Sequence, residues 1–287
     1  MEISVVIPAF DPGPLLREQL DALAAQQSAP EFEVVIADNG CCDDSLAVVA
    51  DYAGLLDVRV VPASDVRGPA HARNVGAALS TAQWLAFCDA DDVAAPGWLA
   101  GLWASRADDA LVTGILDVTL LNPVEVLSAR GGPDVGRSLP VGPCDFLTYA
   151  PSSHLLLSAA RFRELGGWDE SLAHCEDVDL SWRAQLAGHR VVHTPDSTLH
   201  YRLRGSTGDL FRQVRAYKMA EVGLYVRFKE SGAKRPRLRE TAHWWWWLVS
   251  RSPYVVLDTR RRYLWWAAAG CAAGRVRGSV RHRVVYL

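Results

Sequence analysis

The strongest constraint on the fold lies in the first 110 residues, where short apolar runs alternate with segments of helical spacing. The runs are continuous rather than alternating, which is typical of strands buried on both faces. Such strands, separated by helices of 10–13 residues, indicate βαβ units and a mostly parallel sheet. The predicted strands and helices, in chain order, are Ile3–Ala9, Leu15–Gln27, Phe32–Ala37, Asp43–Tyr52, Val58–Val61, Ala70–Leu79 and Trp84–Cys88.

The composition is that of a globular protein, with 287 residues of which 49% are hydrophobic and 22% charged. It excludes a disordered, collagen-like or disulfide-knot chain. The six cysteines form no CxxC pair, and the opening MEISVVIPAF has neither a basic segment nor a signal-cleavage site. We therefore expect a reduced, cytoplasmic chain.

Charge is distributed unevenly along the chain. Residues 1–226 carry 16 Lys and Arg against 30 Asp and Glu, a net charge of −14, whereas residues 227–287 carry 14 against 3, a net charge of +11. Six of the eleven tryptophans lie in the second segment. An acidic body followed by a basic, Trp-rich region predicts two roles in one chain.

Acidic side chains follow three of the predicted strands. Asp11 follows the first strand, Asp38 the second, and Asp89, Asp91 and Asp92 the fourth. Ligands of such sheets bind at the carboxyl ends of the strands, so these side chains are expected at one edge. Carboxylates gathered there repel one another unless a cation lies among them.

An Asp after a strand is also a common helix N-cap, and this alternative applies to Asp43 or Asp44. For the pair Asp89 and Asp91 a site for a hard cation is the better explanation. Other templates are missing from the sequence, which has no GxGxxG, GxxxxGK[ST], GxSxG or HExxH. Dinucleotide, P-loop, hydrolase-elbow and zincin sites therefore have no support.

The rest of the chain is expected to contain further strands and helices. Strands are predicted over Leu111–Leu121, Ser153–Ser158 and Ser197–His200, a Gly- and Pro-rich loop over Gly131–Pro143, and helices over Arg161–Glu170, Val178–Ala187 and Thr207–Glu230.

Six ordered segments resemble the family 2 glycosyltransferases of the GT-A fold over about residues 3–205. They are VVIPAF, ADNGCCDDS, GPAHARNVGAAL, FCDADD, GGWDESL and CEDVDLSWR. The resemblance implies an α/β GT-A catalytic domain over 1–205, with a nucleotide-binding half over 1–110 and an acceptor-binding half over 111–205, followed by a helical basic region over 206–287. It implies inverting transfer of a sugar from a nucleotide-diphosphate donor to a hydroxyl of a glycan or lipid-linked acceptor, as in synthesis of cell-envelope polysaccharide.

A divalent cation is expected to neutralise charge on the departing pyrophosphate, and oxygen ligands favour Mg²⁺ or Mn²⁺. By the resemblance, Asp91 is a metal ligand, while Asp89 faces either the metal or the ribose. His200 is a further metal or phosphate contact, and the alternative is a half-exposed strand histidine.

The residues expected to bind the donor are Pro8, Ala9, Asp11, Asp38, Arg73, Asp89 and Ala90. Asp38 is suited to accept from a pyrimidine N–H or a ribose hydroxyl. Arg73 either reaches the pyrophosphate, as suits a guanidinium, or forms a structural salt bridge with one of these Asp residues. Asp11 and the pair Cys41-Cys42 depart from the family pattern.

The attacking hydroxyl must lose its proton, so a carboxylate base is needed. By the resemblance, Asp177 is the catalytic base, while Glu176 and Asp179 have supporting or structural roles. A helix N-cap or a favourable first-turn charge is the alternative for Glu176 and Asp177. Arg183 is expected to pair with one of these acids. Trp168 is either a core side chain or a platform for an acceptor sugar.

The basic region contains no apolar run of the ~18–20 residues needed to span a bilayer. Trp and Tyr between Arg clusters favour a segment lying at an anionic membrane surface, with 234–287 making peripheral contact on the inner face of the plasma membrane. The alternatives are packing on the catalytic domain and a homodimer. Nucleic-acid binding has no support beyond charge.

Two other functions compete with transfer. A nucleotidyltransferase of related fold needs a basic Gly-rich loop after the first strand, and Phe10–Pro14 is not such a loop. A catalytically inactive homologue could act as a membrane-associated scaffold, but Asp89, Asp91, Glu176 and Asp177 are all present.

Overall fold

The computed structural model describes residues 1–129, 136–253 and 259–286. They form two compact units. The first unit, which we call the catalytic unit after the catalytic domain expected there, comprises residues 1–117, 136–140 and 148–202. The second, the helical unit, comprises residues 118–135, 141–147 and 203–287.

The catalytic unit is built on an eight-stranded sheet in the order β3-β2-β1-β4-β7-β6-β8-β5. All pairs are parallel except those that β7 makes with β4 and β6 and that of β5 with β8. The predicted mostly parallel sheet is therefore confirmed. The strands are β1 (Ile3–Ala9), β2 (Phe32–Asp38), β3 (Asp57–Pro62), β4 (Trp84–Phe87), β5 (Val93–Ala94), β6 (Ala110–Asp117), β7 (Leu155–Ser158) and β8 (Arg190–His200).

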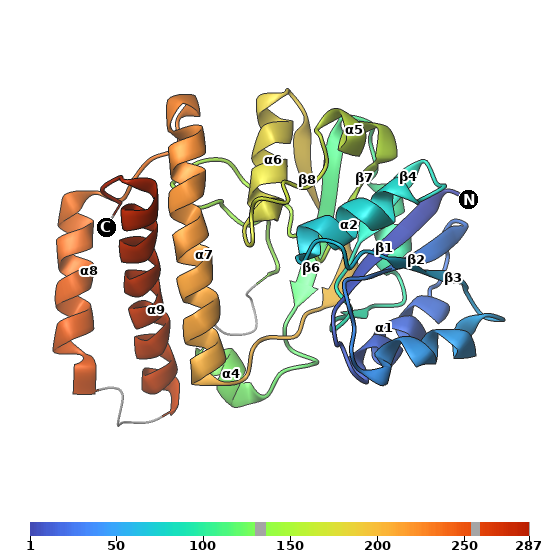
Figure 1. The fold of residues 1–287 in the computed structure, drawn as a ribbon, viewed down its shortest axis with the longest axis horizontal. Coiled ribbons are helices and arrows are strands. Elements are labelled where there is room, and N and C mark those ends of the chain that lie inside the picture. Colours follow the sequence, from blue (N-terminus) through green and yellow to red (C-terminus); the bar gives the residue numbers. More distant parts are fainter. Residues whose placement is uncertain (130–135, 254–258, 287) are drawn as a thin grey trace. The chain divides into compact units, whose positions relative to one another are not determined.

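Helices cover both faces of this sheet (Figure 1). Ile3, Val5 and Ile7 of β1 face the first layer, and Val6 between them faces the second, so one strand contributes to two cores. The first layer contains α1 (Leu15–Ala24), η1 (Asp44–Tyr52) and α3 (Trp98–Ala104). The second contains α2 (Pro69–Ala78), α5 (Ala159–Glu164) and α6 (Glu176–Leu186).

Several boundaries differ from the sequence prediction. The segment η1 is a 3₁₀ helix, in which the buried Val49 and Tyr52 lie three residues apart on one face. The strand predicted over Leu111–Leu121 ends at Asp117, and β8 begins seven residues before the predicted Ser197. Of the predicted loop Gly131–Pro143, residues 131–135 lie outside the described chain.

The helical unit contains α4 (Val124–Ala129), α7 (Thr207–Phe228), η2 (Lys229–Ser231), α8 (Leu238–Ser250) and α9 (Thr259–His282). Among these helices, α7 packs along α9 and α8 lies beside α9 (Figure 1). No helix in the described residues has both the length and the apolar character needed to cross a membrane.

Three glycines, four residues apart, form the surface of α9 that meets α7. A Cβ on Gly270 would lie 2.8 Å from the carbonyl oxygen of Phe211, and a Cβ on Gly278 would lie 2.7 Å from a methyl carbon of Val222. At Gly274 a Cβ would overlap the carbonyl oxygen of Arg215. The two helices approach closely because these positions carry no side chain.

A buried carboxylate holds the end of the chain to α7. Glu221 is 4% exposed, pairs with Lys218 of its own helix, and accepts a 2.8 Å hydrogen bond from the Tyr286 hydroxyl. Arg275 of α9 lies 3.5 Å from the same carboxylate. The helical unit therefore has its own polar core in addition to the apolar contacts of α8 with α9.

We expect Gly274→Ala to destabilise the helical unit by about 1–3 kcal/mol, because the added methyl group cannot be accommodated without separating the helices. Gly208→Ala in α7 is the matched control, since a Cβ there meets nothing closer than 3.8 Å. The control should be neutral or stabilising, because Ala is the better helix former. Urea unfolding followed by Trp fluorescence measures both, and equal stability of the two variants would contradict the tight α7–α9 contact.

Candidate active site

The carboxylates at the ends of β1 and β2 hold the loop that follows β2. Asp11, at a positive φ of 45°, accepts from the backbone N–H groups of Cys42 (2.6 Å) and Asp43 (3.1 Å). Asp38 accepts from those of Gly40 (3.0 Å) and Cys41 (2.8 Å). Both carboxylates therefore order the loop after β2, beside the half-buried Pro8 and the buried Ala9.

Asn39 joins this loop to the start of α2. Its side-chain amide donates to the carbonyl oxygen of Val66 (2.8 Å), and its side-chain oxygen accepts from the backbone N–H of Gly68 (2.8 Å), the residue before α2. Sequence reasoning assigned no role to Asn39. The signal available was its place directly after Asp38 at the end of a buried strand.

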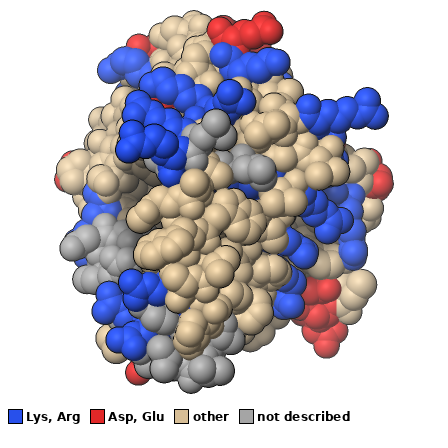
Figure 2. Space-filling model, turned by 90° about the vertical axis from the view of Figure 1, so that its left-hand side faces the viewer, with Lys and Arg blue, Asp and Glu red and all other residues tan. Residues whose placement is uncertain are grey.

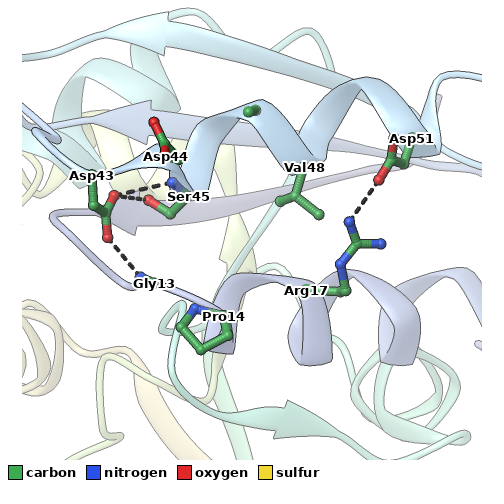
Figure 3. A pocket seen from close by; sticks show the side chains of 9 residues that line it. Gly13, Pro14, Arg17, Asp43, Asp44, Ser45, Val48 and Asp51 are labelled. Carbon is green, nitrogen blue, oxygen red and sulfur yellow. Dashed lines mark hydrogen bonds and ion pairs between the residues drawn. The ribbon is translucent and has the colours of Figure 1, made fainter.

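A pocket of about 500 Å³ lies between α1 and η1 (Figure 3). Asp43 closes one end of it by capping η1 through the backbone N–H of Ser45 and by accepting from that of Gly13 at 2.9 Å. At the other end Arg17 pairs with Asp51 at 2.6 Å. The cap alternative therefore holds for Asp43, and none of the residues expected to bind donor or metal lines this pocket.

Residues 88–92, between β4 and β5, form what we call the acidic turn. Its carboxylates on Asp89, Asp91 and Asp92 bring oxygens within 4.8 Å of one another, close enough to share one ion. Asp92 is 1% exposed, and one of its oxygens has no hydrogen-bond partner in the described structure. Burial, followed by the charges of Asp89 and Asp91, raises the pKa of Asp92 well above its usual value.

This set of donors fits a divalent cation, because it gathers three carboxylates and one of them, Asp92, has a buried oxygen without a hydrogen-bond partner in the described residues. A second trio of Asp11, Cys41 and Asp43 has the same spacing, but its two carboxylates already accept backbone hydrogen bonds. Asp92 was not among the expected ligands, although its place as the third acid of FCDADD was a visible signal.

His200, at the end of β8, lies opposite Val93, the residue that follows the acidic turn. Its Nδ1 is 2.9 Å from a carboxylate oxygen of Asp117, at the end of the neighbouring β6. A carboxylate partner at Nδ1 favours the tautomer that leaves the Nε2 lone pair available to a cation. The arrangement suits the expected metal or phosphate contact, which stays a prediction.

Arg73 of α2 connects the acidic turn to α6. Its guanidinium is 3% exposed and lies 2.6 Å from a carboxylate oxygen of Asp89 and 2.9 Å from one of Glu176. Burial opposes the charged form, but the two carboxylates outweigh it and raise the pKa of Arg73. The salt-bridge alternative for Arg73 is thus what the structure shows.

Trp168 lies beneath this bridge and is buried at 2% exposure. It packs against Phe87 and Phe162 with ring centroids 5.2 and 6.0 Å away, and the Arg73 guanidinium is 5.6 Å from its ring. The structure therefore favours the core role over a sugar platform. Ala90, within the acidic turn, is also buried.

Asp177 stands in the first turn of α6, next to Glu176. Burial, with a smaller contribution from the Glu176 charge, raises the pKa of Asp177 to about 7. Its two oxygens accept from the backbone N–H groups of Val178 (2.8 Å) and Ser152 (3.4 Å). A half-buried carboxylate that titrates near neutrality is suited to accept a proton.

Asp179, the acid expected to have a supporting role, is fully buried. One of its carboxylate oxygens lies 2.7 Å from Nε of Arg183, one turn further along α6. This is the pairing expected for Arg183. The structure therefore brings the acidic turn, Arg73, Glu176 and Asp177 into one connected group, whereas Asp11 and Asp38 are engaged in ordering the loop after β2.

Comparison with known proteins identifies the family to which this chain is similar. Residues 4–126 match the family model described as glycosyl transferase family 2. A pre-mycofactocin glycosyltransferase of Mycobacterium tuberculosis is 30% identical over 241 residues, or 81% of this chain and 49% of that protein. A validoxylamine A glucosyltransferase of Streptomyces hygroscopicus is 40% identical over 110 residues, or 38% of this chain and 24% of that protein. The chain thus spans about half the length of the first relative, and less of the second.

Solved structures show the same fold. A mannosyltransferase of Pyrobaculum calidifontis, in complex with GDP-Man and Mn²⁺, superposes with a TM-score of 0.66 at 18% identity and covers 96% of this chain and 86% of that one. Residues 1–349 of Staphylococcus aureus TarS, in complex with UDP-GlcNAc, give 0.56 at 19% identity and cover 100% and 93%. The expected GT-A fold is confirmed.

We expect Arg73→Met to lower the free energy of unfolding of the catalytic unit by about 3–5 kcal/mol, because it leaves the buried Glu176 carboxylate without a counter-charge. Arg17→Met is the control, since the Arg17–Asp51 pair is exposed and should contribute little. Urea denaturation measures both variants. A loss in Arg73→Met no greater than in the control would show that the bridge is not structural.

Proposed function

This chain belongs to glycosyl transferase family 2, and from that premise we propose that it transfers a sugar, with inversion, from a nucleotide-diphosphate donor to a hydroxyl of a glycan or lipid-linked acceptor. The observation that carries the proposal is the Arg73 bridge, which joins Asp89 to Glu176. Because Asp177 follows Glu176, the bridge ties the element that carries the base to the turn that would hold the metal.

The acidic turn is proposed to hold Mn²⁺ or Mg²⁺ through Asp91, with Asp89 or Asp92 and with His200. When bound, the cation supplies positive charge to the oxygens of the leaving diphosphate. The donor set supports this assignment, because it contains a buried carboxylate oxygen without a partner. Arg73 contributes by fixing Asp89 and Glu176, rather than as a free phosphate ligand.

Asp177 is proposed as the catalytic base. Its carboxylate takes the proton of the acceptor hydroxyl while that oxygen attacks the anomeric carbon, and the bond from that carbon to the diphosphate oxygen breaks on the opposite face. The electron pair of the broken bond leaves with the diphosphate. A base with a pKa near 7 is well matched to this task at neutral pH.

The donor's base and ribose are proposed to lie over Pro8, Ala9, Asp11 and Asp38, with Ala90 below the diphosphate. The loop geometry supports this, because Asp11 and Asp38 order the segment after β2 by accepting backbone hydrogen bonds. An inactive scaffold is the competing proposal. The raised pKa of Asp177 and the acidic turn, whose carboxylates are spaced to hold a metal ion, favour an active enzyme over an inactive scaffold.

The basic region is proposed to make peripheral contact with an anionic membrane through α8. Trp246 and Val249 are 63% and 70% exposed on one face of this helix, and Arg239 lies on the same face. On the side of the molecule drawn in Figure 2, Lys and Arg surround an area of uncharged residues, with few Asp or Glu. Aromatic side chains among basic ones suit the interface of an anionic leaflet.

Transfer is expected to depend on pH through Asp177. The pKa of this carboxyl is raised to about 7, so the group is protonated and unable to act as base at lower pH. The rate kcat/KM should therefore rise with pH up to about 7 and level off above it. Release of nucleoside diphosphate from a panel of UDP- and GDP-sugars measures the profile.

Asp177→Asn should lower the rate at least about 100-fold, the usual contribution of a general base. Asp196→Asn, at an exposed carboxylate of β8, is the control and should keep the wild-type profile. In Asp177→Asn, UDP or GDP with Mn²⁺ should still raise the melting temperature as in wild type. Full transfer by this variant would refute the base assignment.

Membrane contact is expected to require the exposed apolar pair on α8. Trp246→Ser with Val249→Ser should lower the affinity for phosphatidylglycerol vesicles about tenfold, because the lost side chains no longer leave water. Leu186→Ser, at another exposed apolar position, is the control. Sedimentation measures binding. Unchanged binding by the double variant would favour packing or dimerisation over membrane contact.

A further inference from the structure

The acidic turn is anchored at its far end by the last residues of β8. Directly after the turn, β5 pairs antiparallel with β8, with Val93 opposite His200 and Ala94 opposite Leu199. The chain position of the three carboxylates is therefore fixed by a strand that enters the sheet about one hundred residues later.

Arg202 extends this anchor through three contacts. Its backbone N–H donates to the Asp92 carboxylate at 2.9 Å, and its Nε donates to the carbonyl oxygen of Asp91 at 2.9 Å. Its Nη2 lies 2.8 Å from a carboxylate oxygen of Glu18 on α1. One residue thus holds the main chain of Asp91 and the side chain of Asp92, and is itself held by α1.

Gln19, the neighbour of Glu18, holds the other side of the turn. Its fully buried side chain donates to the carbonyl oxygen of Asp89 at 3.1 Å and accepts from the backbone N–H of Ala94 at 2.9 Å. It therefore bridges the start of the turn to the strand that follows. Gln19 and Arg202 therefore donate hydrogen bonds to the carbonyl oxygens of Asp89 and Asp91, the residues on either side of Ala90.

We propose that Arg202 and Gln19 are positioning residues that hold the acidic turn in the conformation that binds a divalent cation. This inference rests on the proposed function, in which the turn holds the metal. Neither residue is assigned contact with the donor or the ion. They act through the carbonyl oxygens of Asp89 and Asp91, because a main chain fixed at those points limits the directions in which the two carboxylates can point.

Such a restraint is needed because the carboxylates repel one another. Three acids with oxygens within 4.8 Å would separate if the turn were free, and the cation would then have to draw them together. When the folded protein already holds the turn, the free energy of bringing the carboxylates together is part of the free energy of folding. It then does not reduce the free energy of cation binding. The affinity for the cation is correspondingly higher.

Positioning and simple electrostatics predict opposite results for Arg202. A guanidinium beside a cation site repels the cation, so removing its charge alone should tighten binding. Removing its hold on the turn should weaken binding instead. The sign of the change in the Mn²⁺ dissociation constant therefore separates the two roles.

The experiment measures free Mn²⁺ by electron paramagnetic resonance, with Mn²⁺ alone and with Mn²⁺ plus UDP or GDP. Arg202→Gln and Gln19→Met should each raise the Mn²⁺ dissociation constant about tenfold or more, the usual effect of losing an outer-shell partner. Arg190→Gln is the matched control, because Arg190 pairs with Asp109 in an exposed ion pair at the opposite end of β8. It should leave the constant unchanged.

A second measurement uses the protein without metal. Hydrogen–deuterium exchange over residues 88–94 should be faster in Arg202→Gln and Gln19→Met than in wild type, while the rest of the catalytic unit exchanges as before. If these variants bind Mn²⁺ as tightly as wild type or more tightly, and their hydrogen–deuterium exchange is unchanged, the positioning roles are wrong but the proposed metal site still stands. Failure of the wild-type chain to bind Mn²⁺ with either diphosphate would overturn the metal of the proposed function, and the positioning roles with it.

Discussion

The site depends on compensation of negative charge at one edge of the sheet. Asp89, Asp91 and Asp92 follow the single strand β4, and α6 adds Glu176 and Asp177. Of these, Asp89 and Glu176 share the buried guanidinium of Arg73. Burial, with a contribution from the Glu176 charge, raises the pKa of Asp177 to about 7, although the charge of Arg73 acts in the opposite direction. The same bridge therefore pairs two of the acids, while Asp177, with its raised pKa, is the one proposed as the proton acceptor.

The two ends of the group differ in how they are held. Asp177 is fixed through its own carboxylate oxygens, which accept from backbone N–H groups. Asp91 is held through its carbonyl oxygen by Arg202, and Asp89 is held through its carbonyl oxygen by Gln19 and through its carboxylate by Arg73. In the proposed function the base must keep one oxygen toward a proton, whereas Asp91, as a ligand of the cation, must keep its side chain available. Restraint by the main chain suits the second requirement.

The sequence predicted the parallel half of the fold because its strands are continuous apolar runs with clear ends, such as Ile3–Ala9. It singled out Asp89, Asp91, Asp177 and Arg73 because motifs are made of side-chain types at fixed spacings, and the roles of these residues stay predictions. It did not predict Asn39, Gln19 or Arg202, which bind main-chain groups that every residue carries. It also did not predict the β5–β8 pair, because a two-residue strand leaves no periodicity.

The helical unit shows why abundant tryptophan alone does not indicate a membrane surface. Trp244, Trp245 and Trp247 pack with α9, where the glycines on another part of that helix allow α7 to approach. Only Trp246 of this run is largely exposed. The apolar side chains of α8 are thus mostly used in the unit's own core. The exposed face of α8 therefore offers an external partner the positive charge around the small apolar area of Trp246 and Val249. This combination favours binding to an anionic surface over binding to an apolar one.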